Sequence, residues 1–116
     1  MVALLNGEGR VVCPSCTVAD SVLTRTKGLL GRSELGPDEG LLLRPANSVH
    51  TAFMRFPIDV VFLDRELNVL DVRASVPPWR LAARRGAQAA LELGAGEASR
   101  RGIAVSDTLR LQGLET

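Results

Sequence analysis

The sequence predicts an α+β domain built on a small, mainly antiparallel β-sheet or partial barrel with one or two short helices. The chain has 116 residues, which fits a single domain over residues 1–116. Its 11 glycines and 6 prolines interrupt the sequence often, which favours short strands joined by turns. Apolar residues make up 46% and charged residues 23%, a composition typical of globular proteins and not of disordered ones.

The expected elements of the first half are short. Residues 2–5 and 10–19 have the composition of strands, and the turn-forming residues 6–9 between them indicate a hairpin. Apolar residues recur on one helical face within residues 20–31, which predicts a short helix. Two further short apolar or β-branched runs follow at 40–43 and 47–51.

The clearest strand spans residues 58–64. Both of its faces are mostly apolar, which predicts a central strand, and residues 69–74 are expected to return as its partner. Residues 80–90 are ambiguous, because Ala and Arg favour a helix whereas Gly86 interrupts it. Short strands at 91–93 and 108–111, and a helical turn at 96–101, complete the prediction.

Several motifs in a fixed order connect the chain to a known family. They lie at residues 25–32, 39–43, 49–64 and 91–96 and at Asp107. In this order and spacing the chain resembles the bacterial and archaeal family DUF 192, also catalogued as UPF 0127, over about residues 17–111. The resemblance implies a small β-rich domain whose biochemical role is unassigned. Many members have a Trp-Met pair where this chain has Phe53-Met54.

The net charge and the search for targeting segments limit which partners and which compartment we expect. The formal charge is +1, so the chain as a whole carries no strong polyanion-binding signal. The sequence contains no run of about 20 apolar residues, so it predicts no membrane span. The apolar start at residues 1–5 is too short for a signal peptide. We therefore expect a cytoplasmic protein without a membrane partner. Its partner would be a small polar ligand or another protein, and its oligomeric state stays open.

The sharpest local pattern is the Cys-x-x-Cys pair of Cys13 and Cys16, which lies before the region of family resemblance. Such a pair can be a redox dithiol or half of a zinc site. In a fully extended strand the two Cα atoms would be about 10 Å apart, too far for a disulfide, whereas Pro14 in a β-turn would bring them within about 7 Å. Zinc within one chain would also need His50 and a carboxylate. We expect two ordinary thiols and no metal or other cofactor.

Polar residues gather in the loop before the central strand, at His50, Thr51, Arg55 and Asp59. The Asp59 carboxylate faces a partly buried surface and should have a partner, for which Arg55, Arg25 and His50 are the candidates. The plain interpretation is a structural ion pair. A second interpretation is a polar pocket in which His50 and Arg55 bind an anionic or hydroxylated ligand. In a third, His50 and Asp59 serve an enzyme as acid and base on a small polar substrate.

A basic segment supplies a weaker alternative, binding of nucleic acid or another polyanion. Residues 73–101 contain six arginines and two glutamates, a local charge of +4, and Trp79 lies among them. Trp79 with Arg80, Arg84 and Arg85 could stack on bases and pair with phosphates. No RNA-binding or helix-turn-helix pattern supports this, so nucleic acid is the less favoured partner. The best interpretation is a small binding or accessory module that uses the loop before the central strand.

Two single carboxylates, Glu92 and Asp107, complete the list of candidates. Glu92 alternates with Leu91 and Leu93, so its side chain should point away from the face that they bury. We expect Glu92 to be solvated and Asp107 to cap a turn.

Overall fold

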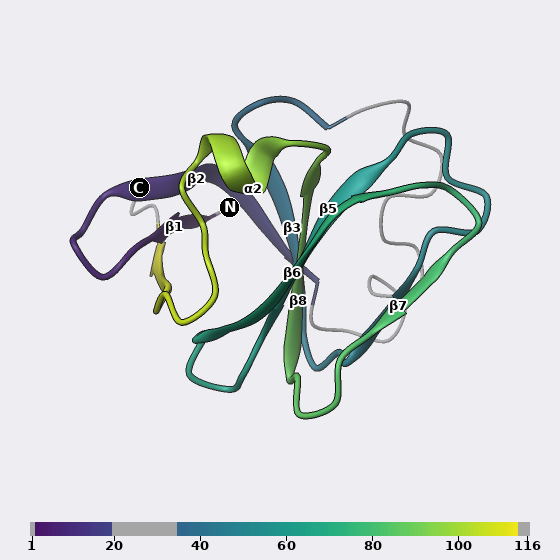
Figure 1. The fold of residues 1–116 in the computed structure, drawn as a ribbon. Coiled ribbons are helices and arrows are strands. Elements are labelled where there is room, and N and C mark those ends of the chain that lie inside the picture. Colours follow the sequence, from purple (N-terminus) through teal and green to yellow (C-terminus); the bar gives the residue numbers. More distant parts are fainter. Residues whose placement is uncertain (1, 20–34, 114–116) are drawn as a thin grey trace.

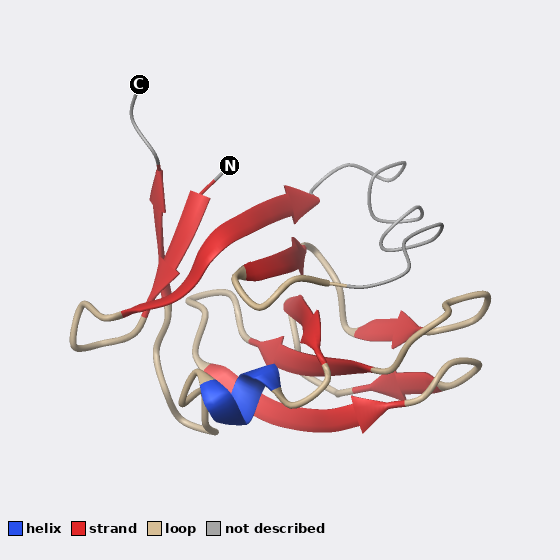
Figure 2. Cartoon of the chain, turned by 90° about the horizontal axis from the view of Figure 1, so that it is seen from above, coloured by secondary structure: helices blue, strands red, loops and turns tan. Residues whose placement is uncertain are grey.

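A computed structural model describes residues 2–19 and 35–113, which form nine strands and one short helix (Figures 1 and 2). Seven strands make one sheet in the order β6-β5-β8-β3-β2-β1-β9, and β4 pairs with β7. The helix expected within residues 20–31 lies outside the described residues. The elements are β1 (Val2–Leu5), β2 (Val11–Ala19), β3 (Glu39–Leu43), β4 (Ser48–His50), β5 (Ile58–Leu63), β6 (Val69–Val76), β7 (Leu81–Ala83), β8 (Ala89–Gly94), α2 (Glu97–Arg100) and β9 (Arg110–Gly113).

The expected mainly antiparallel sheet is confirmed. Among the described strands β2 and β3 run parallel, and every other pair is antiparallel. The sheet is open, because its outer strands β6 and β9 do not pair with each other. The start of β6 is nevertheless joined to the segment before β9 by the bridge between Asn68 and Thr108 and by backbone hydrogen bonds that Leu67 and Val69 make with this segment. The fold is therefore an open, mainly antiparallel sheet whose two ends are linked through this segment.

The central-strand prediction for residues 58–64 is also confirmed. All six residues of β5 are buried, and β5 lies between β6 and β8. Successive residues of β5 belong to two different hydrophobic clusters, one with Val61 and Leu63 and the other with Val60 and Phe62. Because side chains alternate along a strand, the sheet has a core on each of its two faces.

Different elements cover the two faces. Ala98 of α2 packs into the cluster that contains Val61, whereas Val49 of β4 and Ala82 of β7 pack into the cluster that contains Val60. Figure 1 shows α2 and β7 over separate parts of the sheet. Since both faces are covered, a polar side chain on either face of the central strands needs a partner inside the protein.

The turns follow the sequence closely. The Asn6 side chain accepts hydrogen bonds from the backbone N–H groups of Glu8 and Arg10, which closes the expected hairpin between β1 and β2. Asp107 accepts a hydrogen bond from the N–H of Ala104 and caps a turn, as expected. The ambiguous residues 80–90 form β7, a turn and the start of β8. Within the described ranges, no helix has the length and apolar character needed to cross a membrane.

Candidate functional site

Asp59 is buried in the central strand β5 and binds three backbone amides. Its Oδ1 accepts hydrogen bonds from the N–H groups of Ser75, at 2.9 Å, and Gly96, at 3.1 Å. Its Oδ2 accepts one from the N–H of Ala98, at 2.9 Å. The carboxylate thus fixes β6 and the start of α2 to β5, and its polar atoms are satisfied within the fold.

The partners expected for Asp59 were charged side chains. In the described part of the chain no ion pair joins Asp59 to Arg55 or His50, and Arg25 lies outside the described residues. Asp59 has the hydrogen-bond partners that its burial requires, but these partners are backbone amides and not charged side chains. Because its oxygens are buried and engaged, these contacts give no support to a role for Asp59 as a general base with His50.

Thr51 is fully buried and joins two loops. Its hydroxyl donates a hydrogen bond to the carbonyl of Pro77, at 2.6 Å, and accepts one from the N–H of Arg80, at 2.8 Å. Its carbonyl accepts hydrogen bonds from the N–H groups of Met54 and Trp79. Thr51 therefore holds the loop before β5 against the loop before β7.

These two loops present a pair of exposed aromatic rings. Phe53 is 70% exposed and Trp79 is 60% exposed, and their ring centroids are 4.6 Å apart with an interplanar angle of 59°. Both residues have a positive φ, 65° at Phe53 and 64° at Trp79. This conformation is unfavourable for a bulky residue, and such strain concentrates at ligand sites. We call Phe53 and Trp79 the aromatic platform.

The two loops that present the aromatic platform also carry positive and polar side chains. His50, Arg55 and Arg80 are exposed, and residues 50–57 and 77–81 contain no acidic side chain. His50 also pairs through its backbone with Leu81, an exposed apolar residue. We call residues 50–57 and 77–81 the platform surface. It combines exposed rings with positive side chains that form no ion pair within the described part of the chain, a combination suited to a ring-bearing anion.

The structure brings together two groups of residues that the sequence placed apart. His50 and Arg55 from one predicted site lie on the same surface as Trp79 and Arg80 from the other. Arg84 and Arg85 are also exposed, on the turn after β7, where Arg84 lies 4.0 Å from Asp71. Thr51 and Asp59 lie in the interior. Thr51 joins the two loops of this surface, whereas Asp59 bonds to β6 and to the start of α2.

Sequence reasoning missed Phe53. An isolated Phe in an apolar stretch is usually a core residue, so nothing in its own position indicated exposure. The available signal was its alignment with the Trp of the family's Trp-Met pair, because a large aromatic residue at that place need not be part of the core.

Comparison with known proteins places the chain in a family. The model of DUF192, described as an uncharacterized ACR, matches residues 3–111. The chain belongs to the DUF192 family. The match begins before Cys13, so the expectation that the Cys-x-x-Cys pair lies outside the family's shared region is wrong. A search of curated proteins found no match.

Two solved structures resemble this DUF192 protein over nearly its whole length. One is a protein of unknown function from Novosphingobium aromaticivorans DSM 12444, with a TM-score of 0.80 and 26% identity over 94% of this chain and 82% of that chain. The other is a proposed transcription regulator from Sinorhizobium meliloti 1021, with a TM-score of 0.82 and 24% identity over 97% of this chain and 93% of that chain. Both matches show that these proteins share the fold of this chain. The second match is evidence for the shared fold only.

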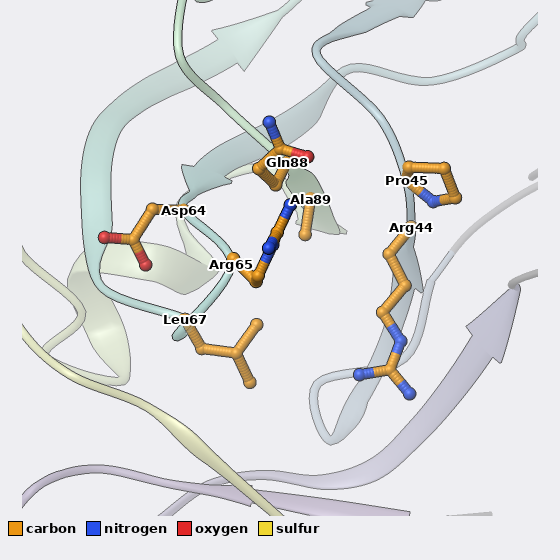
Figure 3. Close-up of a pocket in the computed structure, with 7 residues that line it drawn as sticks. All are labelled: Arg44, Pro45, Asp64, Arg65, Leu67, Gln88 and Ala89. Carbon is orange, nitrogen blue, oxygen red and sulfur yellow. The ribbon is translucent and has the colours of Figure 1, made fainter.

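A cavity of about 450 Å³ lies elsewhere on this DUF192 protein, beside the start of β8 (Figure 3). Arg44 and Arg65 line it, but Figure 3 shows the Arg65 side chain extending toward Gln88 and the Arg44 guanidinium turned away from both. The Asp64 carboxylate at its edge is engaged by Asn68. The charged groups do not converge on one point, so this cavity is a weaker candidate than the platform surface.

The expectation that Glu92 is solvated is wrong. It is 3% exposed and not solvated, because the sheet face opposite Leu91 and Leu93 is also covered. Its Oε1 has no hydrogen-bond partner, and burial raises the pKa of Glu92 to about 7. Glu92 is thus a neutral carboxylic acid over much of the acidic pH range.

Cys13 and Cys16 are both free and fully buried in β2. Across the described ranges, no cluster of three or more His, Cys, Asp or Glu side chains is arranged to hold a metal ion. His50, which a zinc site within one chain would also need, lies on the platform surface in β4.

Proposed function

We propose that this DUF192 protein is a binding module whose working surface is the platform surface and whose ligand is a small ring-bearing anion such as a nucleotide. The observation that carries the proposal is the Phe53–Trp79 pair. Two large rings lie side by side in solvent although the backbone of both residues is strained. Burying a large apolar side chain normally stabilises a fold. An exposed pair of such side chains therefore indicates a binding surface.

The chemistry of the surroundings supports this class of ligand. An aromatic ring stacks on the face of a base or a similar planar group. Arg55 and Arg80 carry guanidinium groups that recognise phosphate or carboxylate through paired hydrogen bonds. His50 can donate or accept a further hydrogen bond. A ligand with a planar ring and a negative group uses all three.

The buried residues beneath the surface support binding by holding its shape. Thr51 bonds both loops, and Asp59 anchors the strand that follows the first loop. A surface that is ordered before the ligand arrives avoids the entropy cost of ordering it on binding. The two interior members of the predicted site would therefore act on affinity through the loops.

The test is calorimetric titration of the whole chain with four probes. They are adenosine monophosphate, adenosine, ribose 5-phosphate and a short single-stranded oligonucleotide. Adenosine monophosphate should bind, and the compounds that carry only its ring or only its phosphate should bind at least about tenfold more weakly. Raising the salt concentration should weaken binding, because exposed charges are screened.

Variants locate the site. Phe53→Ala and Arg80→Ala should each weaken binding of adenosine monophosphate by about tenfold. Val105→Ala and Arg65→Ala are matched controls, since they remove an exposed apolar side chain and an exposed arginine outside the platform surface, and both should bind normally. Binding by the oligonucleotide alone would favour the polyanion alternative through Trp79, Arg80, Arg84 and Arg85. Binding by none of the probes, or equal losses in the controls, would contradict the proposal.

A further inference from the structure

The two thiols of the Cys-x-x-Cys pair share one face of β2. Residues three apart in a regular strand point to opposite faces. Here Cys16 is opposite Val2 of β1 and Cys13 is opposite Leu4, so three steps along β2 match two steps along β1. This is a β-bulge, and its extra residue turns both thiols into the same core cluster.

The bulge also brings the two cysteines close together. They face positions two residues apart on β1, which corresponds to about 6.7 Å along a strand. Disulfides join Cα atoms that are about 4.4–6.8 Å apart. Each of the two thiols shifts the pKa of the other. The pair is therefore within reach of a disulfide, whereas a regular strand would hold its Cα atoms about 10 Å apart.

The surroundings make the two thiols unequal. The guanidinium of buried Arg101 donates hydrogen bonds to the carbonyl of Val12, the residue before Cys13, and to the carbonyl of Glu39. The hydrogen bond from Cys16, aided by the charge of Arg101 and opposed by burial, lowers the pKa of Cys13 to about 7. The same hydrogen bond and burial raise the pKa of Cys16. Cys13 is the thiol that ionises, and Cys16 remains protonated.

A small cavity lies next to Cys13. It has a volume of about 240 Å³, and its lining includes Val12 and Pro14, the two neighbours of Cys13 in β2. Asp38 also lines it, and the Asp38 carbonyl lies 3.8 Å from the Cys13 sulfur. Arg10, Arg100 and Arg101 complete its polar wall. A small neutral oxidant that entered this cavity would contact the residues on both sides of Cys13 in β2.

We propose that Cys13 and Cys16 form a redox site that reacts with hydroperoxides and closes to an intramolecular disulfide. The Cys13 thiolate attacks one peroxide oxygen, the O–O bond breaks, and the other oxygen leaves as water or alcohol after taking up a proton. The sulfur of Cys16 then attacks the Cys13 sulfenic acid, the S–S bond forms, and water leaves with the remaining proton. The two sulfurs together lose two electrons, which the peroxide gains. A small dithiol reverses the step by becoming a disulfide itself.

The experiment treats the folded, reduced whole chain with hydrogen peroxide, then alkylates it in denaturant and measures its intact mass. The wild type should lose two hydrogens and take up no alkyl group, and a dithiol reductant should restore both thiols. Cys16→Ser should stop at a sulfenic acid on Cys13 that dimedone traps. Cys13→Ser should react at least about tenfold more slowly at pH 7, because the remaining thiol ionises less readily.

A second measurement separates the proposal from damage to an unfolded chain. The alkylation rate of Cys13 in Cys16→Ala and in the wild type is followed against pH, together with circular dichroism. The wild-type rate should level off at a lower pH than that of Cys16→Ala, because that variant has no side-chain donor beside Cys13. Folded wild type whose thiols stay reduced in peroxide, or whose two thiols are oxidised separately without a disulfide, would overturn the proposal. So would oxidation that proceeds only at the rate of global unfolding.

Discussion

The Asp59 carboxylate and the backbone amide of Ala98 are joined by a 2.9 Å hydrogen bond across 39 residues of the chain. The same carboxylate binds the amides of Gly96 and Ser75. One buried side chain on the central strand therefore holds the start of α2 and the strand β6 in place. The only acidic member of the predicted polar site supports the fold that carries the surface.

Replacing Asp59 should therefore reduce stability. Asp59→Ala leaves buried amide donors without an acceptor, and we expect a loss of about 3 kcal/mol or more in the free energy of unfolding. Urea denaturation measures it. Asp64→Ala is the control, because Asp64 also accepts three hydrogen bonds but in a turn at the surface, and its loss should cost clearly less stability than that of Asp59. A normal unfolding midpoint in Asp59→Ala with lost ligand binding would instead assign Asp59 to the ligand.

Glu92 should make stability depend on pH. Its pKa is about 7 in the folded protein and 4.5 as the ordinary value, so the folded state binds more protons between these values. Stability is then retained below pH 4.5 and lost as the pH rises through 7, by up to about 3 kcal/mol. Hydrogen bonds from Asn68, Arg73 and Arg100 lower the pKa values of Asp64, Asp71 and Glu97, respectively. The effect of these three carboxylates on stability is opposite to that of Glu92, because their contribution is lost as the pH falls into the acid range.

The difference between wild type and Glu92→Gln isolates this effect. The variant carries a neutral amide at every pH. Its free energy of unfolding should therefore rise relative to that of the wild type by about 3 kcal/mol between pH 4.5 and 8. Thermal or urea unfolding at several pH values measures the difference. Glu66→Gln, which removes an exposed carboxylate, controls for the change in net charge. Parallel pH profiles for wild type and Glu92→Gln would show that burial does not perturb Glu92.

Gly40 should be required to accommodate Cys13. A Cβ atom at Gly40 would lie 2.7 Å from the Cys13 sulfur and 3.0 Å from Leu93. Gly40→Ala should cost about 1–3 kcal/mol in the free energy of unfolding, and adding Cys13→Ala should recover part of the loss. Gly7→Ala, whose Cβ would meet only one atom at 4.0 Å, should stay within about 0.5 kcal/mol of wild type. Additive losses in the double variant would show that the sulfur is not the obstacle.

Much of the sheet could be predicted because strand patterns are local. The alternation in residues 58–64 identifies a strand covered on both faces, and β5 has this position. Residues 80–90 were ambiguous because Ala and Arg favour helix in isolation, whereas pairing of β7 with β4 decides the outcome. Glu92 was misplaced because alternation tells which face a side chain takes but not whether that face is covered.

The candidate site was harder to predict because its relationships are not local. Burial indicated that Asp59 needs a partner, but a backbone amide has no sequence signature, so the roles of Gly96 and Ala98 could not be foreseen. The two cysteines share a face only because β2 bulges against β1, which is a matter of pairing register. Trp79 and Phe53 meet only because Thr51 joins their loops.

The proposed site can be monitored directly, because Trp79 is the single tryptophan of the chain. The decisive measurement is the intrinsic fluorescence of the whole protein during titration with adenosine monophosphate at low ionic strength. We expect a saturable change in Trp79 emission that weakens by about tenfold in Phe53→Ala and is unchanged in Val105→Ala. Emission that stays constant up to millimolar nucleotide, or that changes equally in both variants, would contradict binding at the Phe53–Trp79 platform.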